Sequence, residues 1–226
     1  YEKAHLHCDV LVIGAGPAGL MAARAATRAG ARTVLLEEDW RLGGRALAEA
    51  QELDGAPAAH WVEAVEAELT AAPRCRILRR TAAYGLFDHG VVGAVERVAD
   101  HLPEPPAHLP RQRAWRIVAR RIVIAAGAIE RPIVFAGNDR PGVMLAGAVR
   151  AYVNRYAVKP GQRAVVFAAG DDGWRTVPAL AAAGVEVTAV VDPRTEIAPP
   201  LRAQAERAGA QVITGVVVGT VGRQRL

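Results

Sequence analysis

A phosphate-binding spacing of glycines follows a short apolar stretch near the start of the chain, in Gly14-Ala15-Gly16-Pro17-Ala18-Gly19. Glycines at the first, third and sixth positions permit a tight strand-to-helix turn whose backbone can approach a pyrophosphate. The amide groups at the start of the following helix then favour the phosphate charge. Glu37 lies 23 residues after Gly14, where a carboxylate at the end of the next strand can bind the ribose of an adenosine. The pattern therefore predicts an adenine-nucleotide site. Because the carboxylate needs a free 2′-hydroxyl on the ribose, the site disfavours NADP.

Two further segments extend this predicted site. Gly43-Gly44 follows the acid and is flanked by Arg41 and Arg45, which could bring backbone and positive charge to the phosphates or could be ordinary solvated arginines. Residues 122–127 resemble the apolar strand ending in Ala-Thr-Gly that closes the cofactor domain of two-domain flavoproteins, with Ala126 in place of Thr. We expect the cofactor-binding residues to be Gly14, Gly16, Pro17, Ala18, Gly19, Glu37, Glu38, Arg41, Gly43, Gly44, Arg45, Ala83, Ala126 and Gly127.

A second glycine loop occupies residues 168–173, but its sequence is altered. Its first glycine is replaced by Ala168, and Asp171 and Asp172 put carboxylates where a pyrophosphate would lie. Each carboxylate would repel a phosphate by about 1 kcal/mol even in a water-like dielectric. We therefore predict that this half keeps the fold and has lost the nucleotide.

No side chain outside the loops has the partners that catalysis or metal binding requires. The histidines at 60, 89, 101 and 108 fall at helix edges or in loops, without a nucleophile or carboxylate arranged beside them. Cys8 and Cys75 lack metal-ligand spacing and indicate reduced, buried thiols. We predict no catalytic residue and no metal site in this chain, and we interpret the tryptophans as packing residues.

The elements that must position the loops follow from periodicity and turn residues. A strand over 8–13, a helix over 18–29 and a strand over 32–37 form one βαβ unit, preceded by a polar arm over 1–7. A helix over 57–71, strands within 76–98 around the turn 88–90, a Pro-rich connection and a strand over 114–126 follow. After a helix over 143–156, the second unit has strands at 164–167, 185–192 and 211–214 and helices at 173–183 and 201–208.

This order predicts an α/β protein with the two-dinucleotide-binding-domain flavoprotein fold. A Rossmann-like domain with a β-meander would occupy residues 1–158, and a second, degenerate and truncated nucleotide-binding-like domain would occupy residues 159–226. The chain starts at Tyr1 without Met and ends abruptly at Leu226, so we interpret it as a fragment or a processed product.

The composition limits the partners and the location. Hydrophobic residues make up 51% of the 226, and no apolar run reaches the length of a membrane span. The net charge of +5 comes mainly from scattered arginines, without a basic run interleaved with aromatic residues. We therefore expect a cytoplasmic protein with neither a nucleic-acid nor a membrane partner.

Longer runs of the sequence resemble the α subunit of heterotetrameric sarcosine oxidases. The most specific is 135–144 (FAGNDRPGVM), because generic pyridine-nucleotide reductases lack its Asn-Asp-Arg-Pro-Gly-Val-Met segment. Residues 126–132 (AGAIERP), 148–156, 7–10 (HCDV) and 81–85 (TAAYG) are also similar to that family. The resemblance covers essentially the whole chain.

The resemblance implies a role in the oxidation of sarcosine to glycine, with electrons passing through flavins to oxygen and the one-carbon unit passing to tetrahydrofolate. It implies β, γ and δ partner subunits, with FMN between α and β and with FAD in the β subunit. It places a non-exchanging NAD at Gly14, Gly16, Gly19 and Glu37, with a mainly structural role. Family α chains also have a ferredoxin-like region before this segment and a folate-binding domain after it.

Several alternatives stay open. Related α subunits of amine, proline and opine dehydrogenases hold FAD or ATP in the same loop, and the loop sequence does not separate these ligands from NAD. The chain could instead be an FAD-dependent NAD(P)H oxidoreductase that transfers hydride itself, although the altered second loop argues against this. A third alternative is a non-catalytic binding module whose nucleotide stabilises assembly.

Overall fold

The computed structural model describes residues 1–50 and 52–219, which divide into two compact units. The first unit contains the described residues of Tyr1–Ala46 and Gln51–Ala128. The second contains Leu47–Ala50 and the described residues of Ile129–Leu226. Each unit has its own sheet and its own core.

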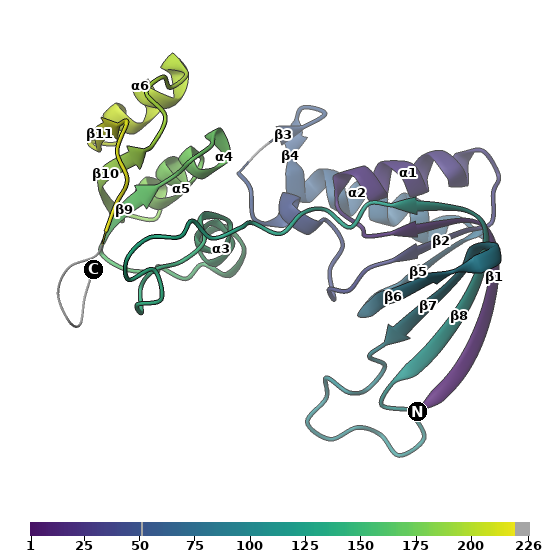
Figure 1. Cartoon of the computed structure of the whole chain (residues 1–226). Helices are drawn as coiled ribbons and strands as arrows, with labels where there is room; N and C mark the ends of the chain where they lie inside the picture. Colours follow the sequence, from purple (N-terminus) through teal and green to yellow (C-terminus); the bar gives the residue numbers. More distant parts are fainter. Residues whose placement is uncertain (51, 220–226) are drawn as a thin grey trace. The chain divides into compact units, whose positions relative to one another are not determined.

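A six-stranded sheet in the order β5-β2-β1-β8-β7-β6 forms the centre of the first unit (Figure 1). Strands β5, β2, β1 and β8 are parallel, whereas β6, β7 and β8 pair antiparallel as a meander. The predicted α/β class, with a parallel sheet and a β-meander, is therefore confirmed. The strands are β1 (Glu2–Ile13), β2 (Thr33–Leu36), β5 (Cys75–Leu78), β6 (Thr81–Phe87), β7 (Val91–Glu96) and β8 (Arg113–Ile124).

Strand β1 begins earlier than the sequence pattern predicted. Residues 2–7, predicted to be an arm, pair in parallel with the first half of β8, from Glu2 opposite Arg113 to His7 opposite Val118. The prediction was wrong because this half of the strand is polar on its outer face, while Ala4 and Leu6 pack inward on the core. Figure 1 shows β1 and β8 side by side along their whole length.

Two helices cover one face of the parallel strands (Figure 1). These are α1 (Pro17–Arg28) and α2 (Ala58–Ala71), close to the predicted ranges 18–29 and 57–71. Both helices and the sheet contribute to one buried cluster, in which α2 presents the predicted apolar face of Trp61, Val62, Val65 and Leu69. A second cluster on the other face is enclosed by the meander strands, and it includes Leu11, Leu36, Val92, Trp115 and Ile117.

Shorter elements complete the first unit. A 3₁₀ turn, Gly44–Leu47, follows the second strand, and the pair β3 (Glu52–Leu53) and β4 (Ala56–Pro57) precedes α2. The predicted turn at 88–90 is a 3₁₀ turn between β6 and β7. The Pro-rich segment 97–112 joins β7 to β8 without helix or strand.

The second unit has a three-stranded parallel sheet in the order β11-β10-β9. Its strands alternate with helices, which is the βαβ arrangement of the first unit on a smaller scale. In chain order the elements are α3 (Ala146–Arg150), a π-helical turn (Ala151–Arg155), β9 (Arg163–Phe167), α4 (Asp171–Trp174), α5 (Thr176–Ala182), β10 (Glu186–Asp192), α6 (Pro199–Arg207) and β11 (Gln211–Thr214).

The helix predicted over 173–183 is divided into α4 and α5. The break falls at Arg175, just before the first turn of α5. Pro178 has no N–H to donate to the carbonyl of Trp174, four residues earlier, and its ring crowds that carbonyl. Pro178 therefore sits in the first turn of a new helix, where a missing N–H costs little.

Within the described residues, no helix is both long and apolar enough to cross a membrane. Both cysteines are free thiols, with Cys8 buried and Cys75 partly buried.

We expect both thiols to react slowly in the folded chain. Burial raises the pKa of Cys8 to about 11, and the neighbouring Asp9 carboxylate adds to this effect. Burial also raises the pKa of Cys75. Titration with a chromogenic disulfide at pH 8 should therefore proceed slowly in buffer and release two equivalents rapidly in guanidinium chloride. Rapid reaction of either thiol in the native chain would contradict the buried placement.

Candidate nucleotide site at the first glycine loop

The first glycine loop turns sharply at Gly14, which adopts a φ of +95°. A Cβ there would lie 2.4 Å from the carbonyl oxygen of Ala125 and 3.0 Å from the Cα of Ala126. The backbone amide of Ala125 also donates to the carbonyl of Ile13, so the end of β8 lies against the end of β1. Only glycine fits at position 14, because both the backbone conformation and the space exclude a side chain.

Gly16 and Gly19 serve two different purposes. A Cβ on Gly19 would lie 1.8 Å from the carbonyl oxygen of Gly14, so this glycine allows α1 to pack against the preceding turn. A Cβ on Gly16 would meet no atom within 4 Å, and its φ of −68° is open to any residue. The fold therefore requires Gly19, whereas Gly16 leaves open space above the loop where a ligand backbone could approach.

No side chain of the helix's own first turn neutralises the positive N-terminal end of α1. No side chain caps its first turn, which also contains no acidic residue, and Pro17 occupies the first helical position. Pro17 has no N–H, so the amides of Ala18 and Gly19 are the donors that face outward from this end. A 12-residue helix with an uncapped start is well suited to an anion.

Glu37 directly follows β2 and is only 7% exposed. Its Oε2 accepts a hydrogen bond from the backbone amide of Ala15 at 2.8 Å, and its Oε1 accepts from the amide of Asp39 at 2.9 Å. A carboxylate has about four acceptor positions. Each oxygen of Glu37 therefore keeps one position for a ribose hydroxyl.

The Gly43-Gly44 segment lies beside the loop, as the sequence predicted. The amide of Gly43 donates to the carbonyl of Ala15 at 2.8 Å, and a Cβ on Gly44 would lie 3.0 Å from the Cα of Gly16. Both residues have positive φ, of +119° and +50°. The structure thus brings two glycine-rich backbones together where a pyrophosphate would need close approach.

The remaining candidates differ in how directly they adjoin the loop. Ala126 contacts the position of Gly14, and Gly127 follows it with a φ of +73°. Arg41 lies 5.6 Å over the ring of Trp40 and only 3.9 Å from a carboxylate oxygen of Glu63.

Three candidates are placed by other features of the first unit. The side chains of Glu38 and Arg45 are exposed, and the Glu38 carbonyl accepts a hydrogen bond from Arg97. Ala83 packs in the meander-side core, on a strand whose first residue, Thr81, donates to the Glu37 carbonyl.

One partner in the site was not predicted. Ala15, the variable residue between Gly14 and Gly16, supplies the loop amide that fixes Glu37. The sequence signal that could have found it is the acid at the end of β2, since a buried carboxylate needs a donor and the loop is the nearest backbone. The donor is a main-chain group, so residue type carried no information about it.

The second glycine loop keeps the packing feature of the first. A Cβ on Gly173 would lie 2.6 Å from the Cβ of Ala168, as a Cβ on Gly19 would collide with Gly14 in the first loop. Ala168 does not adopt a positive φ, so the sharp turn seen at Gly14 does not recur. Asp171 and Asp172 occupy the first turn of α4.

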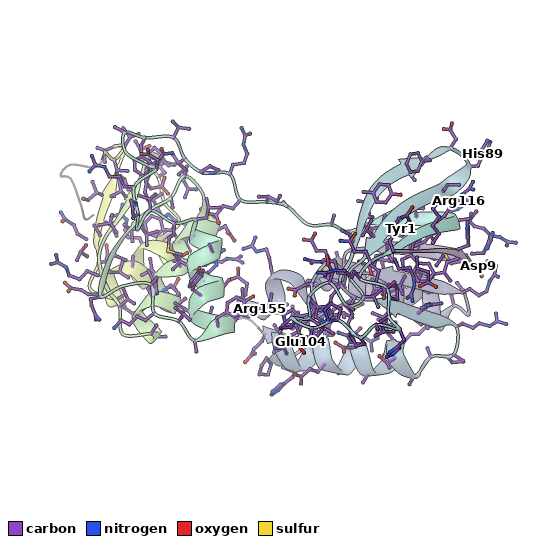
Figure 2. All side chains as sticks on the ribbon, turned by 90° about the horizontal axis from the view of Figure 1, so that it is seen from below. Tyr1, Asp9, His89, Glu104, Arg116 and Arg155 are labelled. Carbon is purple, nitrogen blue, oxygen red and sulfur yellow. The ribbon has the colours of Figure 1, made fainter. Side chains whose placement is uncertain are left out.

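The histidines lie away from the glycine loop's contacts, and all six are exposed. Figure 2 shows His89 at the end of the β6–β7 hairpin. Among the described residues, no group of three or more His, Cys, Asp or Glu is arranged to hold a metal ion.

The chain is similar in sequence to known oxidoreductases. Residues 9–103 match a family model described as FAD dependent oxidoreductase. The chain is 48% identical over 219 residues to the alpha subunit of sarcosine oxidase from Rhizobium meliloti, a match that covers 97% of this chain and 22% of that protein. It is 49% identical over 220 residues to the corresponding subunit from Corynebacterium sp. (strain P-1), covering 96% of this chain and 22% of the relative.

A solved structure is also similar. L-proline dehydrogenase from P. horikoshii superimposes with a TM-score of 0.66 and 25% identity, covering 99% of this chain and 37% of that one. The chain therefore spans only a part of each of these relatives, and 22% of the sarcosine oxidase subunits.

Substitution of the two loop glycines separates folding from binding. We expect Gly16→Ala to change the free energy of unfolding by less than about 1 kcal/mol, since its Cβ meets open space. The same change should weaken nucleotide binding at least about tenfold, because the added methyl group occupies the approach to the loop. Gly19→Ala should instead lower the free energy of unfolding by about 3 kcal/mol or more. Urea unfolding and calorimetric titration of both variants would measure this, and equal stability losses would contradict the division of roles.

Proposed function

We propose that this chain, a homologue of sarcosine oxidase α subunits, holds one adenine dinucleotide at its first glycine loop. The observation that carries the proposal is the buried Glu37 carboxylate, which is fixed by the loop amide of Ala15 and keeps an open acceptor position on each oxygen. A carboxylate so placed matches the paired hydroxyls of an adenosine ribose.

The chain's own residues would divide the ligand between them. The amides of Ala18 and Gly19 and the positive end of α1 would hold the pyrophosphate. Gly16 and Gly44 would let it approach the backbone, and Glu37 would hold the ribose. A 2′-phosphate would bring negative charge against the Glu37 carboxylate, so the site favours NAD over NADP.

Two dinucleotides fit this description. NAD follows from the resemblance to the α subunits of heterotetrameric sarcosine oxidases, and it would serve there as a structural ligand. FAD is the second candidate, because the family model that matches residues 9–103 is that of an FAD dependent oxidoreductase. Both share the ADP half that the described residues would bind, so the loop geometry is compatible with either.

The role proposed for the chain is that of a scaffold within a larger enzyme. Sarcosine and tetrahydrofolate as substrates, β, γ and δ partner subunits, and FMN and FAD elsewhere in the assembly are part of the same proposal. The matched relatives are named as α subunits, which supports a multi-subunit enzyme. None of the described residues at the loop is placed to transfer a proton, so we assign no catalytic residue to this chain.

Glu37 provides the direct test, with its neighbour Glu38 as a matched control. Glu37→Gln puts an amide NH₂ opposite one of the two backbone donors and removes the negative charge. We expect it to weaken NAD or ADP-ribose binding by about 10- to 100-fold, the loss associated with charge-assisted hydrogen bonds. Glu38→Gln, at an exposed side chain, should bind as the unchanged chain does.

The measurement is calorimetric titration of ligand-stripped protein, with circular dichroism to verify that each variant is folded. If both variants bound NAD and FAD as tightly as the unchanged chain, the ribose-binding role of Glu37 would be wrong.

A further inference from the structure

The second unit contains an acid in the position that Glu37 has in the first unit. Asp192 is the last residue of β10, the strand that follows the second glycine loop and its helices. It is fully buried, with 0% of its surface exposed. An acid at the end of this strand is the group that would bind a ribose if the second loop held a dinucleotide.

Protein donors fill the Asp192 carboxylate completely. Its Oδ1 accepts from the backbone amide of Arg194 at 2.9 Å and from the Arg194 Nε at 3.0 Å. Its Oδ2 accepts from a terminal guanidinium nitrogen of Arg194 at 2.8 Å and from the indole nitrogen of Trp174 at 2.8 Å. Four donors on about four acceptor positions leave none for a ribose hydroxyl.

The same guanidinium reaches the glycine loop. The other terminal nitrogen of Arg194 donates to Oδ1 of Asp171 at 2.8 Å, at the start of α4. Arg194 therefore joins the loop to the end of β10, the two places that a dinucleotide would have to span. Burial opposes ionisation of Asp192, but the hydrogen bonds from Arg194 and Trp174 outweigh it and lower the pKa of that carboxyl. The ion pair is thus intact at neutral pH.

A second arginine engages the other loop acid. Arg150 is only 1% exposed and donates to the Asp172 carboxylate at 2.8 Å. It also donates to the Asp172 carbonyl and to the Thr176 hydroxyl, both at 2.9 Å. With Asp172 held in this way, Arg194 is the arginine that pairs with both Asp171 and Asp192.

The comparison with the first loop shows what differs. Glu37 is held by two backbone amides and keeps two acceptor positions. Asp192 accepts from one backbone amide, and the side chains of Trp174 and Arg194 fill its other positions. Both loops keep the close glycine packing that the βαβ fold needs. The second unit therefore retains the framework of a nucleotide site, while donors of the protein itself occupy the acceptor positions of Asp192 that a ribose would need.

We infer that Arg194 is a specificity-determining residue that closes the second glycine loop to dinucleotides by occupying the ribose-binding carboxylate of Asp192 and pairing with Asp171. The chain then has a single dinucleotide site. This inference uses residues separate from those at the first loop and does not depend on which ligand that loop binds.

The test removes the first site and then opens the second in the full chain. In a Gly16→Asp background, which places a carboxylate in the first loop, titration with NADH should give zero bound equivalents. Adding Asp171→Gly removes one repelling charge, and adding Arg194→Ala opens one acceptor position on each Asp192 oxygen. The amide of residue 194 and the Trp174 indole remain as donors. This variant should gain saturable binding at a stoichiometry of one, at least about tenfold tighter than any binding by the Gly16→Asp chain.

Two controls accompany the gain-of-binding variant. The first control carries Arg202→Ala in place of Arg194→Ala. It removes a partly exposed arginine of α6 that lies 3.9 Å from Glu206, and it should leave binding at zero equivalents. If Arg194→Ala does not fold, Arg194→Gln shortens and neutralises the side chain while keeping an amide donor, and the same gain is expected from it. Circular dichroism identifies the folded variants.

Two outcomes would overturn the inference. One is a bound equivalent in the Gly16→Asp chain that retains Arg194, because the loop would then be open already. The other is no gain of binding in folded Arg194→Ala and Arg194→Gln variants that carry Asp171→Gly. Failure of the proposed function is a separate result, seen as zero equivalents in the chain with an unchanged first loop.

Discussion

The hydrogen bond from the Ala15 amide to Glu37 is the interaction on which the candidate site depends. It joins the glycine loop after β1 to the end of β2 at 2.8 Å, and the carboxylate that accepts it is nearly buried. Removing a buried carboxylate from water is costly unless donors surround it. The loop amide and the Asp39 amide supply those donors, so folding of the βαβ unit itself sets the position of the acid.

The two units share a βαβ framework but differ in whether the acid near the end of the second strand keeps open acceptor positions. In each, a glycine packs the first helix turn against the preceding strand end, and an acid lies at the end of the next strand or directly after it. In the first unit the donors to that acid are main-chain amides, which leave acceptor positions open. In the second, the side chains of Arg194 and Trp174 add to a main-chain amide and fill the remaining acceptor positions. The difference in ligand capacity therefore arises from a few side chains and leaves the backbone framework in place.

The sequence predicted the parts of the structure that depend on local pattern. The βαβ order, the apolar face of α2 and the turn at 88–90 follow from periodicity and turn residues, and the family resemblance is confirmed by relatives at 46–49% identity. The first half of β1 was missed because its pairing partner is β8, more than 100 residues away, and its outer face is polar. Long-range pairing of this kind leaves little local signal.

The site was predictable to a similar degree. Glycine spacing located Gly14, Gly19 and the Gly43-Gly44 segment, where positive φ or close packing favours glycine. It also located Gly16, which leaves open space above the loop. The Ala15–Glu37 bond and the Arg194 network were not predicted. The first uses a main-chain donor at a variable position, and the second joins residues 171, 174, 192 and 194, whose proximity exists only in the folded unit.

The central claim is that this chain binds one adenine dinucleotide, at the first glycine loop. The most direct measurement is to denature the purified chain, collect the released small molecule, and determine its identity and amount by absorbance and mass spectrometry. The account predicts one equivalent of dinucleotide per chain, colourless if it is NAD and yellow if it is FAD. Two equivalents per chain, or a released ligand without an ADP group, would contradict it.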